Sequence, residues 1–556
     1  MRNREKPELL ISAPPKDSEQ NMTPAVINAL HILQKAGGGV LRFERGIYHF
    51  YEEGTEERFY AVSNNAAGVK RIVFPLLHMN GITVDGGGSH FVIHGKIFPF
   101  VVDDCKNVNL KNIYFDRDRS PHVSLKIRGI TESGFDLEID RQLCPFYVED
   151  GSLFLKKEHG YYSGKEQVFS LHSADRIRVR YLLTGNCTAR YDHLPTPYMW
   201  ADAEETEWGV HLSYRPVEGA IPCPYEEEER LSFFPDGGRE NDLIFLQNSE
   251  EIRIEDVTIR QTMGMGVIAE LCRNVTIKGL RTDYDEQAGG VTTTADMLHF
   301  VNCDGRLEIS DCHITHTEDD ILNVHGMYTR LCTADENTLL TQIMHHEQEG
   351  FCPYLAGDRL SLIQQNNGEI LGEFIVSSHQ FEKDAQNLIR LEGKWEYGLD
   401  RILETTEDIL VENPHRMPDL HLHHNYFYRF PHLRISGAGQ LLIEHNHIEC
   451  AKAAALLMDL AQYWYESGRI RHLVFRNNRL IRCNALGQGP GFIQIGVSGH
   501  EDKDAPKIHE HIEITDNEFS GILSYAVTAG GVKELILRNN TTDSGSFPTR
   551  IFEIEE

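Results

Sequence analysis

Three aspartates on two neighbouring segments have the residue type and spacing that acid–base chemistry needs. The segments are VTTTADMLHF (291–300) and HTEDDILNV (316–324). An offset of 24 residues aligns them and places Asp296 beside Asp320, with Asp319 directly before it. If the two segments are strands of adjacent coils, they lie about 4.8 Å apart. Three carboxylates then crowd at one edge of the strand stack.

Crowded carboxylates cannot all ionise easily, so at least one of the three should have a raised pKa. No Lys or Arg lies beside them in the sequence to neutralise them. A carboxyl that holds a proton next to an ionised one is what hydrolysis of a glycosidic bond requires. A solvated acidic turn is the alternative in a chain of net charge −30. The apolar context and the position at strand starts favour a functional cluster.

Polar residues recur at the middle of the short strands that follow these aspartates. His299, Asn323, Arg434 and Gln494 are central in LHF, LNV, LRI and IQI. Stacked in consecutive coils, they would form the floor of a groove with donors for sugar hydroxyls. His325, just after the second segment, is a further candidate contact.

A second group of candidates lies in the segment AQYWYESG, on a long turn between coils. Trp464, Tyr465 and Glu466 could form a platform for the face of a hexose, although core packing explains Trp464 equally well. Histidines are also dense in two later coils, but inward and outward positions alternate there, so they cannot all converge on a metal. We therefore interpret them as structural: His421, His423, His424, His445 and His447. There is no P-loop, GxGxxG, GxSxG or HExxH motif.

The elements that must position these residues follow from a recurring pattern: apolar, any, apolar, two residues, a small or amide residue, any, apolar. Copies begin at residues 108, 252, 275, 307, 420, 441, 473, 512 and 535, and a degenerate copy at 82. Each copy is short and rich in β-branched residues, which indicates a strand. A second short strand follows each copy. Repeats of this length built on short strands in a fixed order predict a parallel β-helix.

The sixth position of the pattern is an asparagine in the last five copies. Asn tolerates the left-handed conformation of a tight bend, and stacked Asn side chains can hydrogen-bond along the coils. The residues are Asn425, Asn446, Asn478, Asn517 and Asn540. Before the repeats, DSEQNMTPAVINALHILQKAGGG predicts a helix that covers the open end of the stack, followed by a first strand and turn in VLRFERGIYHF.

Two stretches interrupt the repeat with alternating strands and polar turns, and each predicts an antiparallel β insertion that could wall a cleft. The predicted organisation is a cap and first coils at 1–117, an insertion at 118–241, coils carrying the aspartates at 242–326, a second insertion at 327–417, and C-terminal coils at 418–556.

Composition restricts the partners. With 84 acidic and 54 basic residues, the surface repels phosphate backbones, so we expect no nucleic-acid partner. No apolar run approaches the ~20 residues that span a bilayer, and the first residues hold no signal-peptide core. The eleven scattered cysteines are expected to be reduced thiols. A cytoplasmic location is therefore expected, although a chain trimmed of its signal peptide would look the same.

The segments TTTADMLHFVNCDG, EDDILNVHGMY, HEQEGF and YWYESG together resemble glycoside hydrolase family 110, a family of exo-acting α-1,3-galactosidases that includes enzymes removing galactose from blood-group-B structures. The resemblance runs from about residue 20 to 540. It implies a right-handed parallel β-helix of the pectate-lyase-like type with two β-barrel-like insertions and no cofactor. We also expect no metal, because no histidine or cysteine set completes a site. The resemblance also implies an α-galactoside glycan as the substrate and inversion of the anomeric configuration, with a homodimer as a possible assembly.

The resemblance places the catalytic carboxylates on Asp296, Asp319 and Asp320. We expect Asp296 to be the acid and Asp319 with Asp320 to activate water, separated by the ~6.5–9.5 Å of the inverting geometry. The remaining candidates are contacts to the sugar. The chain departs from the family in lacking a secretion signal and in carrying Glu270 at the end of GVIAE, where an amide is expected.

Three alternatives stay open at this stage. The first is an inverting β-helix glycosidase for another α-linked sugar, of the polygalacturonase type, which would need basic residues such as Arg434 to hold uronates. The second is a polysaccharide lyase, which needs a Lys, Arg or Tyr base and usually calcium. The third is a non-catalytic glycan-binding or tail-fibre β-helix. Fold alone does not separate them.

Overall fold

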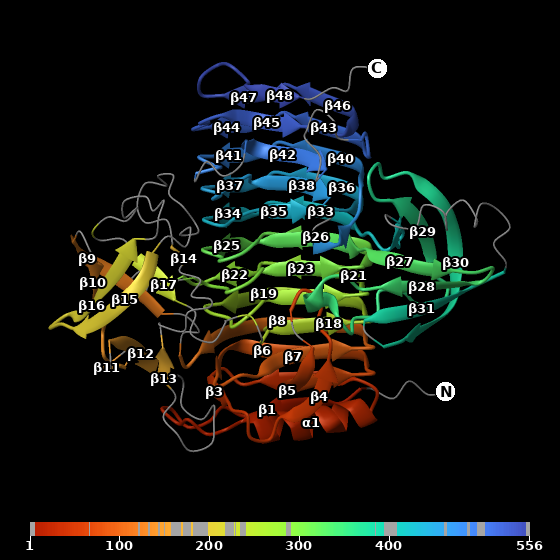
Figure 1. Ribbon diagram of the computed structural model, residues 1–556. Helices are drawn as coiled ribbons and strands as arrows, with labels where there is room; N and C mark the ends of the chain where they lie inside the picture. Colours follow the sequence, from red (N-terminus) through yellow and green to blue (C-terminus); the bar gives the residue numbers. More distant parts are fainter. Residues whose placement is uncertain are drawn as a thin grey trace.

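Parallel strands stacked in successive coils form the body of the protein (Figure 1). The computed structural model describes residues 6–551 except 66, 120–122, 132–133, 143–144, 150, 157–167, 171–179, 182–197, 217–226, 228–229, 234–238, 240, 285–290, 384, 394–408, 461–463, 486–489 and 498–505. No helix among these residues is long and apolar enough to cross a membrane.

One parallel sheet, here called the site sheet, carries the candidate residues. Its strands follow one another coil by coil. They are β5 (Gly68–Leu77), β7 (Phe98–Asp103), β18 (Ile244–Gln247), β20 (Val267–Glu270), β23 (Leu298–Val301), β26 (Leu322–Met327), β35 (Leu433–Ile435), β38 (Leu456–Leu460), β42 (Gly491–Val497), β45 (Tyr525–Ala529) and β48 (Thr549–Ile551). The register pairs Leu298 with Leu322 and His299 with Asn323, which confirms the 24-residue offset predicted from the sequence.

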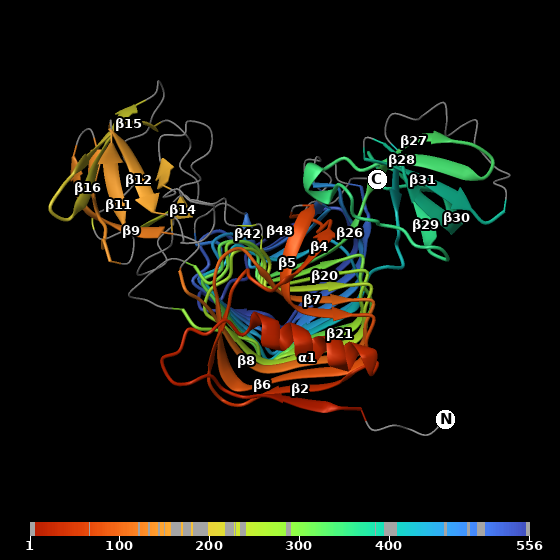
Figure 2. The same ribbon diagram turned by 90° about the horizontal axis from the view of Figure 1, so that it is seen from below.

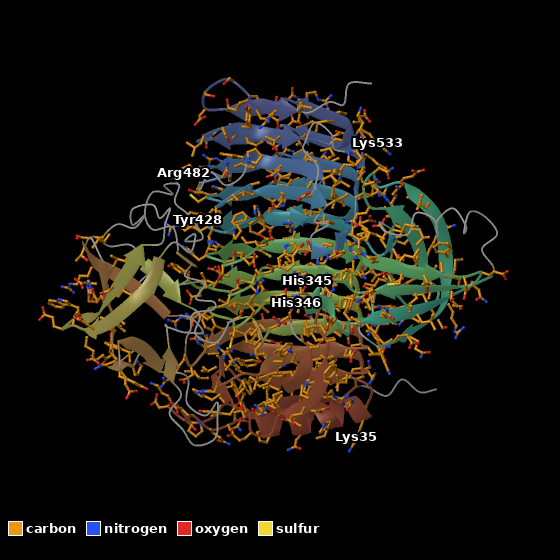
Figure 3. The ribbon with its side chains drawn as sticks, in the orientation of Figure 1. Lys35, His345, His346, Tyr428, Arg482 and Lys533 are labelled. Carbon is orange, nitrogen blue, oxygen red and sulfur yellow. The ribbon has the colours of Figure 1, made fainter. Side chains whose placement is uncertain are left out.

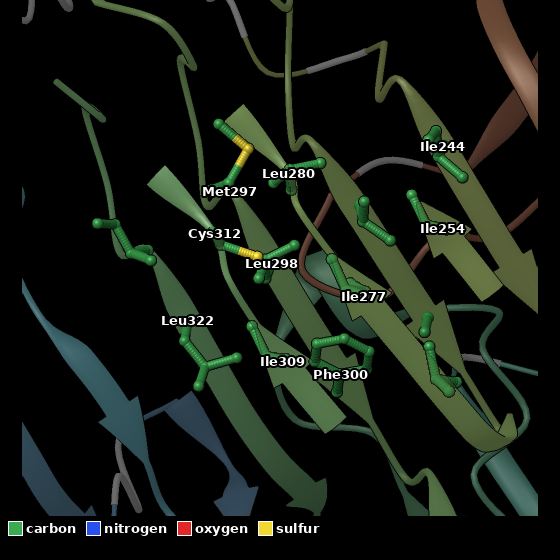
Figure 4. Packing of buried hydrophobic residues seen from close by; sticks show 14 of the residues in the cluster. Ile244, Ile254, Ile277, Leu280, Met297, Leu298, Phe300, Ile309, Cys312 and Leu322 are labelled. Atoms are coloured by element: carbon green, nitrogen blue, oxygen red, sulfur yellow. The ribbon is translucent and has the colours of Figure 1, made fainter. Parts of the chain in front are cut away.

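A second parallel sheet, here called the bent sheet, is formed by the recurring pattern itself. Its main strands are β2 (Gly39–Phe43), β6 (Asn80–Ile93), β8 (Lys106–Arg117), β19 (Glu250–Ile259), β21 (Arg273–Lys278), β24 (Asp304–Ser310), β33 (Asp419–His423), β36 (Ala438–Glu444), β40 (Ile470–Arg476), β43 (His509–Thr515) and β46 (Val532–Arg538). Apolar side chains of both sheets point inward and pack as one core, as Leu298, Leu322, Ile277 and Ile309 do in Figure 4. The predicted parallel β-helix is therefore confirmed.

The asparagine ladder is present in the bent sheet. Side-chain amides of Asn425, Asn446, Asn478, Asn517 and Asn540 hydrogen-bond from coil to coil at 2.9–3.1 Å. The predicted left-handed conformation, however, belongs to the preceding residue. It occurs at His424, His445, Asn477, Asp516 and Asn539, with φ between 53° and 57°. The bend thus turns the following Asn inward, where its amide needs the partners that the stack supplies.

The N-terminal end is covered as predicted. Helix α1 (Thr23–Lys35) buries Val26, Leu30 and Leu33 against the first coils, and it lies across the end of the stack in Figure 2. A strand that the pattern did not predict, β1 (Glu8–Ile11), pairs in parallel with β2.

Two antiparallel units project on opposite sides of the stack (Figures 1 and 2). The first contains a sheet of β14 (Arg180–Tyr181), β17 (Arg230–Phe233), β9 (Val123–Thr131), β10 (Gly134–Glu138), β16 (Gly209–Pro216) and β15 (Tyr198–Glu205). Much of the rest of the predicted 118–241 insertion lies outside the described residues. The second closes into a barrel of β27 (Thr329–Ala334), β28 (Thr338–Gln342), β31 (Gln386–Leu391), β30 (Ile370–Phe381), β29 (Arg359–Gln364) and β32 (Ile409–Glu412).

The cysteines depart from the expectation in one place. Among the described residues, seven are free thiols, most of them buried in the coils. Cys450, in contrast, is disulfide-bonded, so the expectation that all thiols are reduced is wrong there.

Candidate active site

The site sheet brings the three predicted aspartates together. Asp296 lies just before β23, and Asp319 and Asp320 lie just before β26. The amide of Met297 donates to the carbonyl of Asp320 at 2.9 Å, which fixes the two strand starts side by side. One carboxylate oxygen from each aspartate lies within 4.8 Å of one from each of the others. The crowding that the alignment predicts is therefore present.

Burial raises the pKa of two of the three aspartates. Asp296 and Asp320 are only 4% and 6% exposed. Burial and the charge of Asp319 raise the pKa of Asp296, against the opposing effect of His299. Burial, followed by the charges of Asp319 and Asp296, raises the pKa of Asp320 well above its ordinary value. Both can therefore hold a proton at a pH where an exposed aspartate cannot.

Asp319 differs because it has a cation beside it. Arg239 Nη2 lies 2.8 Å from Asp319 Oδ2. The sequence shows no Lys or Arg beside the cluster, and the folded protein brings one from a distant segment. Arg239 is 80 residues from Asp319 in sequence, at the return from the first insertion, and only the folded topology brings it here. The guanidinium favours the ionised form of Asp319, whereas the group beside Asp296 is the ring of His299, at 2.6 Å.

The nearest oxygens of the cluster are closer than the sequence-based expectation for acid and base. A spacing within 4.8 Å is shorter than the ~6.5–9.5 Å between the carboxyl groups of inverting glycosidases.

These carboxylates line a cavity of about 270 Å³ above the site sheet. This is slightly below the ~300–1,000 Å³ of pockets for drug-sized ligands, so it suits a single sugar ring. Its walls come from segments distant in sequence. The lining residues are Asn64, Arg239, Met265, Asp296, His299, Glu318, Asp319, Asp320, Asn323, Glu347, Pro431, His432, Arg434, Lys452, Ala453, Trp464 and Glu466. Figure 3 labels His345 and His346, next to Glu347, at the level of the middle coils.

A buried carboxylate at the edge of the cavity organises several of the predicted contacts. Glu466 lies in β39 (Glu466–Ser467), which pairs antiparallel with β26. It accepts hydrogen bonds from Asn64 Nδ2 at 3.1 Å and Asn323 Nδ2 at 3.5 Å, and Arg434 Nε lies 3.4 Å from it. Burial raises the pKa of Glu466, but His325 and Arg434 outweigh that effect, so the pKa is lowered and the group is ionised.

Asp320 and Asn323 each present a side-chain oxygen that is left for a ligand. Among the described residues, Asp320 Oδ1 and Asn323 Oδ1 are buried and have no hydrogen-bond partner. Both residues line the cavity. Buried polar atoms are normally paired, so these two oxygens indicate where hydroxyl groups or water bind.

Five of the predicted sugar contacts line the cavity: His299, Asn323, Arg434, Trp464 and Glu466. His325 does not line it but lies behind His299, with the Nε2 atoms of the two rings 2.9 Å apart. The Trp464 ring lies 4.5 Å from that of His345 and is partly exposed, so it is available for stacking.

Gln494 is not among the residues that line the cavity. The central column of the site sheet runs His299, Asn323, Arg434, Leu457 and Gln494. The coil that carries Leu457 therefore separates Arg434 from Gln494. The expectation that His299, Asn323, Arg434 and Gln494 occupy consecutive coils is wrong.

Glu270 also lies outside the cavity lining. Its carboxylate is fully buried and accepts from the Ser63 amide at 2.5 Å and from Gln247 Nε2 at 3.1 Å. Burial raises the pKa of Glu270 to about 8. The adjoining Asn65 donates to Asp242 at 2.7 Å. Glu270 thus holds the segment that carries Asn64 into the cavity, rather than contacting a sugar itself.

Sequence reasoning missed the lining residues that come from outside the repeat. Asn64 follows β4 (Glu56–Tyr60), and Glu347 lies in the 3-10 helix η1 (His346–Gln348) after β28. Neither segment carries a motif. A signal did exist for Glu347, because it lies within the HEQEGF segment that contributed to the family resemblance.

Two groups of described residues bring three possible metal-ligand atoms within 4.8 Å of one another. One is the aspartate cluster itself, and the other is His472, His511 and Glu513 on the bent sheet. Close carboxylates are common without an ion, and spacing alone makes neither group a metal site. The histidines at 421–447 make local contacts instead, such as His421 Nε2 with Glu444 Oε1 at 3.2 Å.

Fold and site together define a parallel β-helix with a cluster of three carboxylates in a small cavity. No family model matches the chain. Curated relatives do: the α-1,3-galactosidase A of Shewanella woodyi is 26% identical over 547 residues, covering 96% of this chain and 85% of that protein. An α-1,3-galactosidase B of Phocaeicola vulgatus is 28% identical over 576 residues, covering 94% and 90%. The chain is a homologue of these proteins along nearly its whole length, which confirms the family resemblance.

Solved structures overlap more weakly. The exopolygalacturonase of Thermotoga maritima is 11% identical, with a TM-score of 0.35, and the match covers 99% of this chain and 93% of that one. The A-module of the mannuronan C-5 epimerase AlgE4 of Azotobacter vinelandii is 8% identical with a TM-score of 0.39, covering 97% of each chain.

Proposed function

We propose that this protein is an exo-acting α-galactosidase that hydrolyses terminal α-1,3-linked galactose with inversion. The observation that carries the proposal is the carboxylate cluster in the small cavity, where Arg239 pairs with Asp319 while Asp296 and Asp320 are buried. Homologues named α-1,3-galactosidase over 94–96% of the chain support the coarser statement, an α-galactosidase.

In this proposal Asp296 is the general acid. Its raised pKa favours the protonated form, and it passes its proton to the glycosidic oxygen as the C1–O bond breaks. The electron pair of the broken bond stays on the leaving oxygen. Asp319, kept ionised by Arg239, accepts a proton from the attacking water, and Asp320 helps to orient that water through its unpartnered Oδ1. Attack from the face opposite the leaving group inverts the anomeric centre.

The cavity supports exo action on a neutral sugar. Its volume of about 270 Å³ fits one ring and not an extended chain. Arg434 and Arg239 are each paired with a carboxylate, Glu466 and Asp319, so neither is presented to a uronate as a polygalacturonase-type site would require. Asn323, with its free oxygen, and the partly exposed Trp464 suit hydroxyl groups and a sugar face.

The test is a panel of linear and fucosylated α-1,3-galactosides together with α-1,4- and α-1,6-galactosides and an oligogalacturonide, read by released monosaccharide. Galactose released from α-1,3 linkages alone supports the proposal. The Asp320→Asn variant should lose activity, whereas Asp311→Asn, an exposed aspartate on the bent-sheet side, should keep it. Release of galacturonate indicates the polygalacturonase-type alternative, an unsaturated product indicates a lyase, and binding without turnover indicates a glycan-binding module.

A further inference from the structure

Two buried histidines behind Asp296 form a chain of hydrogen bonds that ends on a main-chain carbonyl. His299 Nδ1 lies 2.6 Å from Asp296 Oδ2, and His299 Nε2 lies 2.9 Å from His325 Nε2. His325 Nδ1 lies 2.6 Å from the carbonyl oxygen of Gly326. Both imidazole rings are 1% exposed, so water does not compete for these contacts.

The Gly326 carbonyl at the end of this chain of hydrogen bonds determines which ring nitrogens of the two histidines carry a hydrogen. A carbonyl oxygen only accepts, so His325 Nδ1 must carry a hydrogen and donate it to Gly326. Rotating the ring by 180° would place carbon atoms against both Gly326 and His299 and lose both bonds. Burial lowers the pKa of His325 to about 4, so near neutral pH the ring is neutral and its Nε2 is an acceptor.

The hydrogen bond between His299 and His325 then has one possible direction. Because His325 Nε2 accepts, His299 Nε2 must donate to it. A neutral His299 therefore has a lone pair on Nδ1, which faces Asp296 Oδ2 at 2.6 Å. Two acceptors at that distance would repel each other, so a proton must lie between them.

We propose that Asp296 and His299 hold one shared proton, and that His325, anchored on the carbonyl of Gly326, is the positioning residue that keeps it there. The proton resides either on the Asp296 carboxyl or on the His299 ring, and in both cases the pair is neutral overall. An ionised Asp296 beside a neutral His299 is excluded by the tautomer. The inference rests on the proposed function for its consequence: the pair is an acid loaded before the substrate arrives.

The protein surroundings are built to keep this geometry. Gly326 pairs with Ser467 at the point where β26 leaves the parallel sheet for β39. A Cβ on Gly326 would come within 2.4 Å of side-chain atoms of Ser467 and Met417, so those side chains would have to shift to admit one.

The charged groups around the pair come from several elements. Asp319 and Asp320 face Asp296 from the start of β26, and Arg239 faces it from the first insertion. Glu466 in β39 lies 3.6 Å from His325 Nε2, farther than His299, and Arg434 in β35 and the buried Asp242 also act on the histidines. Net negative charge on this side favours keeping a proton on the pair.

The experiment reads the protons directly and needs no substrate. Long-range ¹H–¹⁵N spectra of the histidine-labelled protein, assigned with His299→Gln and His325→Gln, should show His325 as the neutral Nδ1–H form and His299 protonated on Nε2 at pH 7. A carboxylic acid C=O stretch that disappears in Asp296→Asn, or a His299 imidazolium, locates the shared proton. A neutral His299 with hydrogen on Nδ1 and none on Nε2 overturns the inference, whether or not the protein releases galactose.

A second measurement tests the consequence for catalysis. His325→Gln keeps an acceptor for His299 Nε2, whereas His325→Leu removes it and frees His299 to turn to the Nδ1–H form. We expect His325→Leu to lose about 10- to 100-fold of kcat on a natural galactoside, at or below the lower end of the 10²–10⁴ typical of general acid catalysis, because the acid itself is still present. The basic limb of its pH profile should move to lower pH. His325→Gln should return the basic limb to its wild-type position. His511→Gln, a substitution on the bent sheet, should leave the whole pH profile as in the wild type. Equal pH–rate profiles for His325→Leu and His325→Gln would overturn the positioning role of His325.

Discussion

Arg239 Nη2 donates to Asp319 Oδ2 at 2.8 Å, across the boundary between the first insertion and the coil stack. The two residues are brought together by the return of the chain from the insertion, and the ion pair makes one aspartate of the three electrostatically distinct. Charges of Asp319, Asp296 and Glu347 raise the pKa of Arg239 against the effect of burial, so the guanidinium stays charged.

Removing this cation should weaken the base. In Arg239→Met, the cluster of three carboxylates loses the guanidinium that pairs with Asp319, so it becomes easier to protonate. We expect a loss of at least about tenfold in kcat/KM and a shift of the acidic limb of the pH–rate profile to higher pH. The profile is measured on one galactoside across pH 4–9. Arg273→Met, which removes an exposed ion pair with Asp304, is the control and should leave the profile unchanged.

The anomeric configuration of the galactose that is released first tests the proposed inversion. If Asp319 activates water on the face opposite the leaving group, an α-galactoside yields the β-anomer of galactose first, before mutarotation. Proton NMR of the early reaction distinguishes the two anomers. The short spacing between the cluster oxygens makes this test informative, because retaining enzymes also have close carboxylates. Early α-galactose would remove the inverting mechanism.

Activity should survive the removal of metal ions. The proposed steps use only carboxyl groups, so prolonged dialysis against EDTA should leave kcat within about twofold of the untreated protein. Calcium prefers carboxylate oxygens, and the cluster spacing would accommodate it. Loss of activity on chelation with recovery on added calcium would therefore point to the lyase alternative.

The buried Glu270 should make stability depend on pH. Its pKa is raised to about 8 in the folded state, whereas an unfolded glutamate titrates near 4.5. Between these values the folded state binds more protons, so this contribution to stability is complete below about pH 4.5 and falls as pH rises toward 8. The change is on the order of a few kcal/mol. Glu270→Gln keeps a neutral group of the same shape and should flatten this dependence.

Thermal unfolding at pH 5 and pH 8 checks the effect. The drop in Tm between the two values should be smaller in Glu270→Gln than in the wild type. Asp242, whose pKa burial raises to about 6, contributes in the same direction and remains in both proteins. Glu250→Gln, at an exposed ion pair with Lys106, is the control. An equal drop in all three proteins would mean that Glu270 is ionised in the folded state.

The sequence predicted those features that the coil repeat determines. Strand register follows from the apolar pattern, and a one-residue error would turn every side chain to the other face, so the offset that joins Asp296 to Asp320 could be read directly. The ladder through Asn446 followed from the same register. Gln494 was misplaced because the series of polar central residues passed over Leu457, the apolar residue at this position of the intervening coil.

Residues outside the repeat could not be predicted in this way. Asn64, Arg239 and Glu347 reach the cavity from a hairpin loop and from both insertions, whose paths depend on tertiary packing and not on a local pattern. The role of Glu270 was likewise hidden, because its partners at Ser63 and Gln247 are far apart in sequence. The repeat pattern therefore predicted the residues on the site sheet, whereas the residues that wall the cavity, including the cation Arg239, could be identified only from the folded structure.

Substrates with different leaving groups separate the roles within the cluster. An acid is needed when the leaving group is poor, because a phenol of low pKa departs without protonation. A base is needed for either substrate, because water must still be activated at the anomeric carbon. If Asp296 is the acid, Asp296→Asn should lose about 10²–10⁴-fold on galactosyl-galactose and much less on an activated aryl α-galactoside. Asp319→Asn and Asp320→Asn should lose activity on both substrates.

The pattern of losses decides the assignment. Azide should rescue one of the base variants and give β-galactosyl azide, because a small anion can occupy the place of the water that Asp319 and Asp320 hold. Should Asp319→Asn keep its aryl activity while Asp296→Asn loses activity on both substrates, the roles are reversed. Asp319 would then donate the proton from the more exposed side of the cluster, toward which the leaving group departs. Near-normal rates in all three variants, with Asp311→Asn as the control for a charge change alone, would mean that the buried cluster does not carry the chemistry.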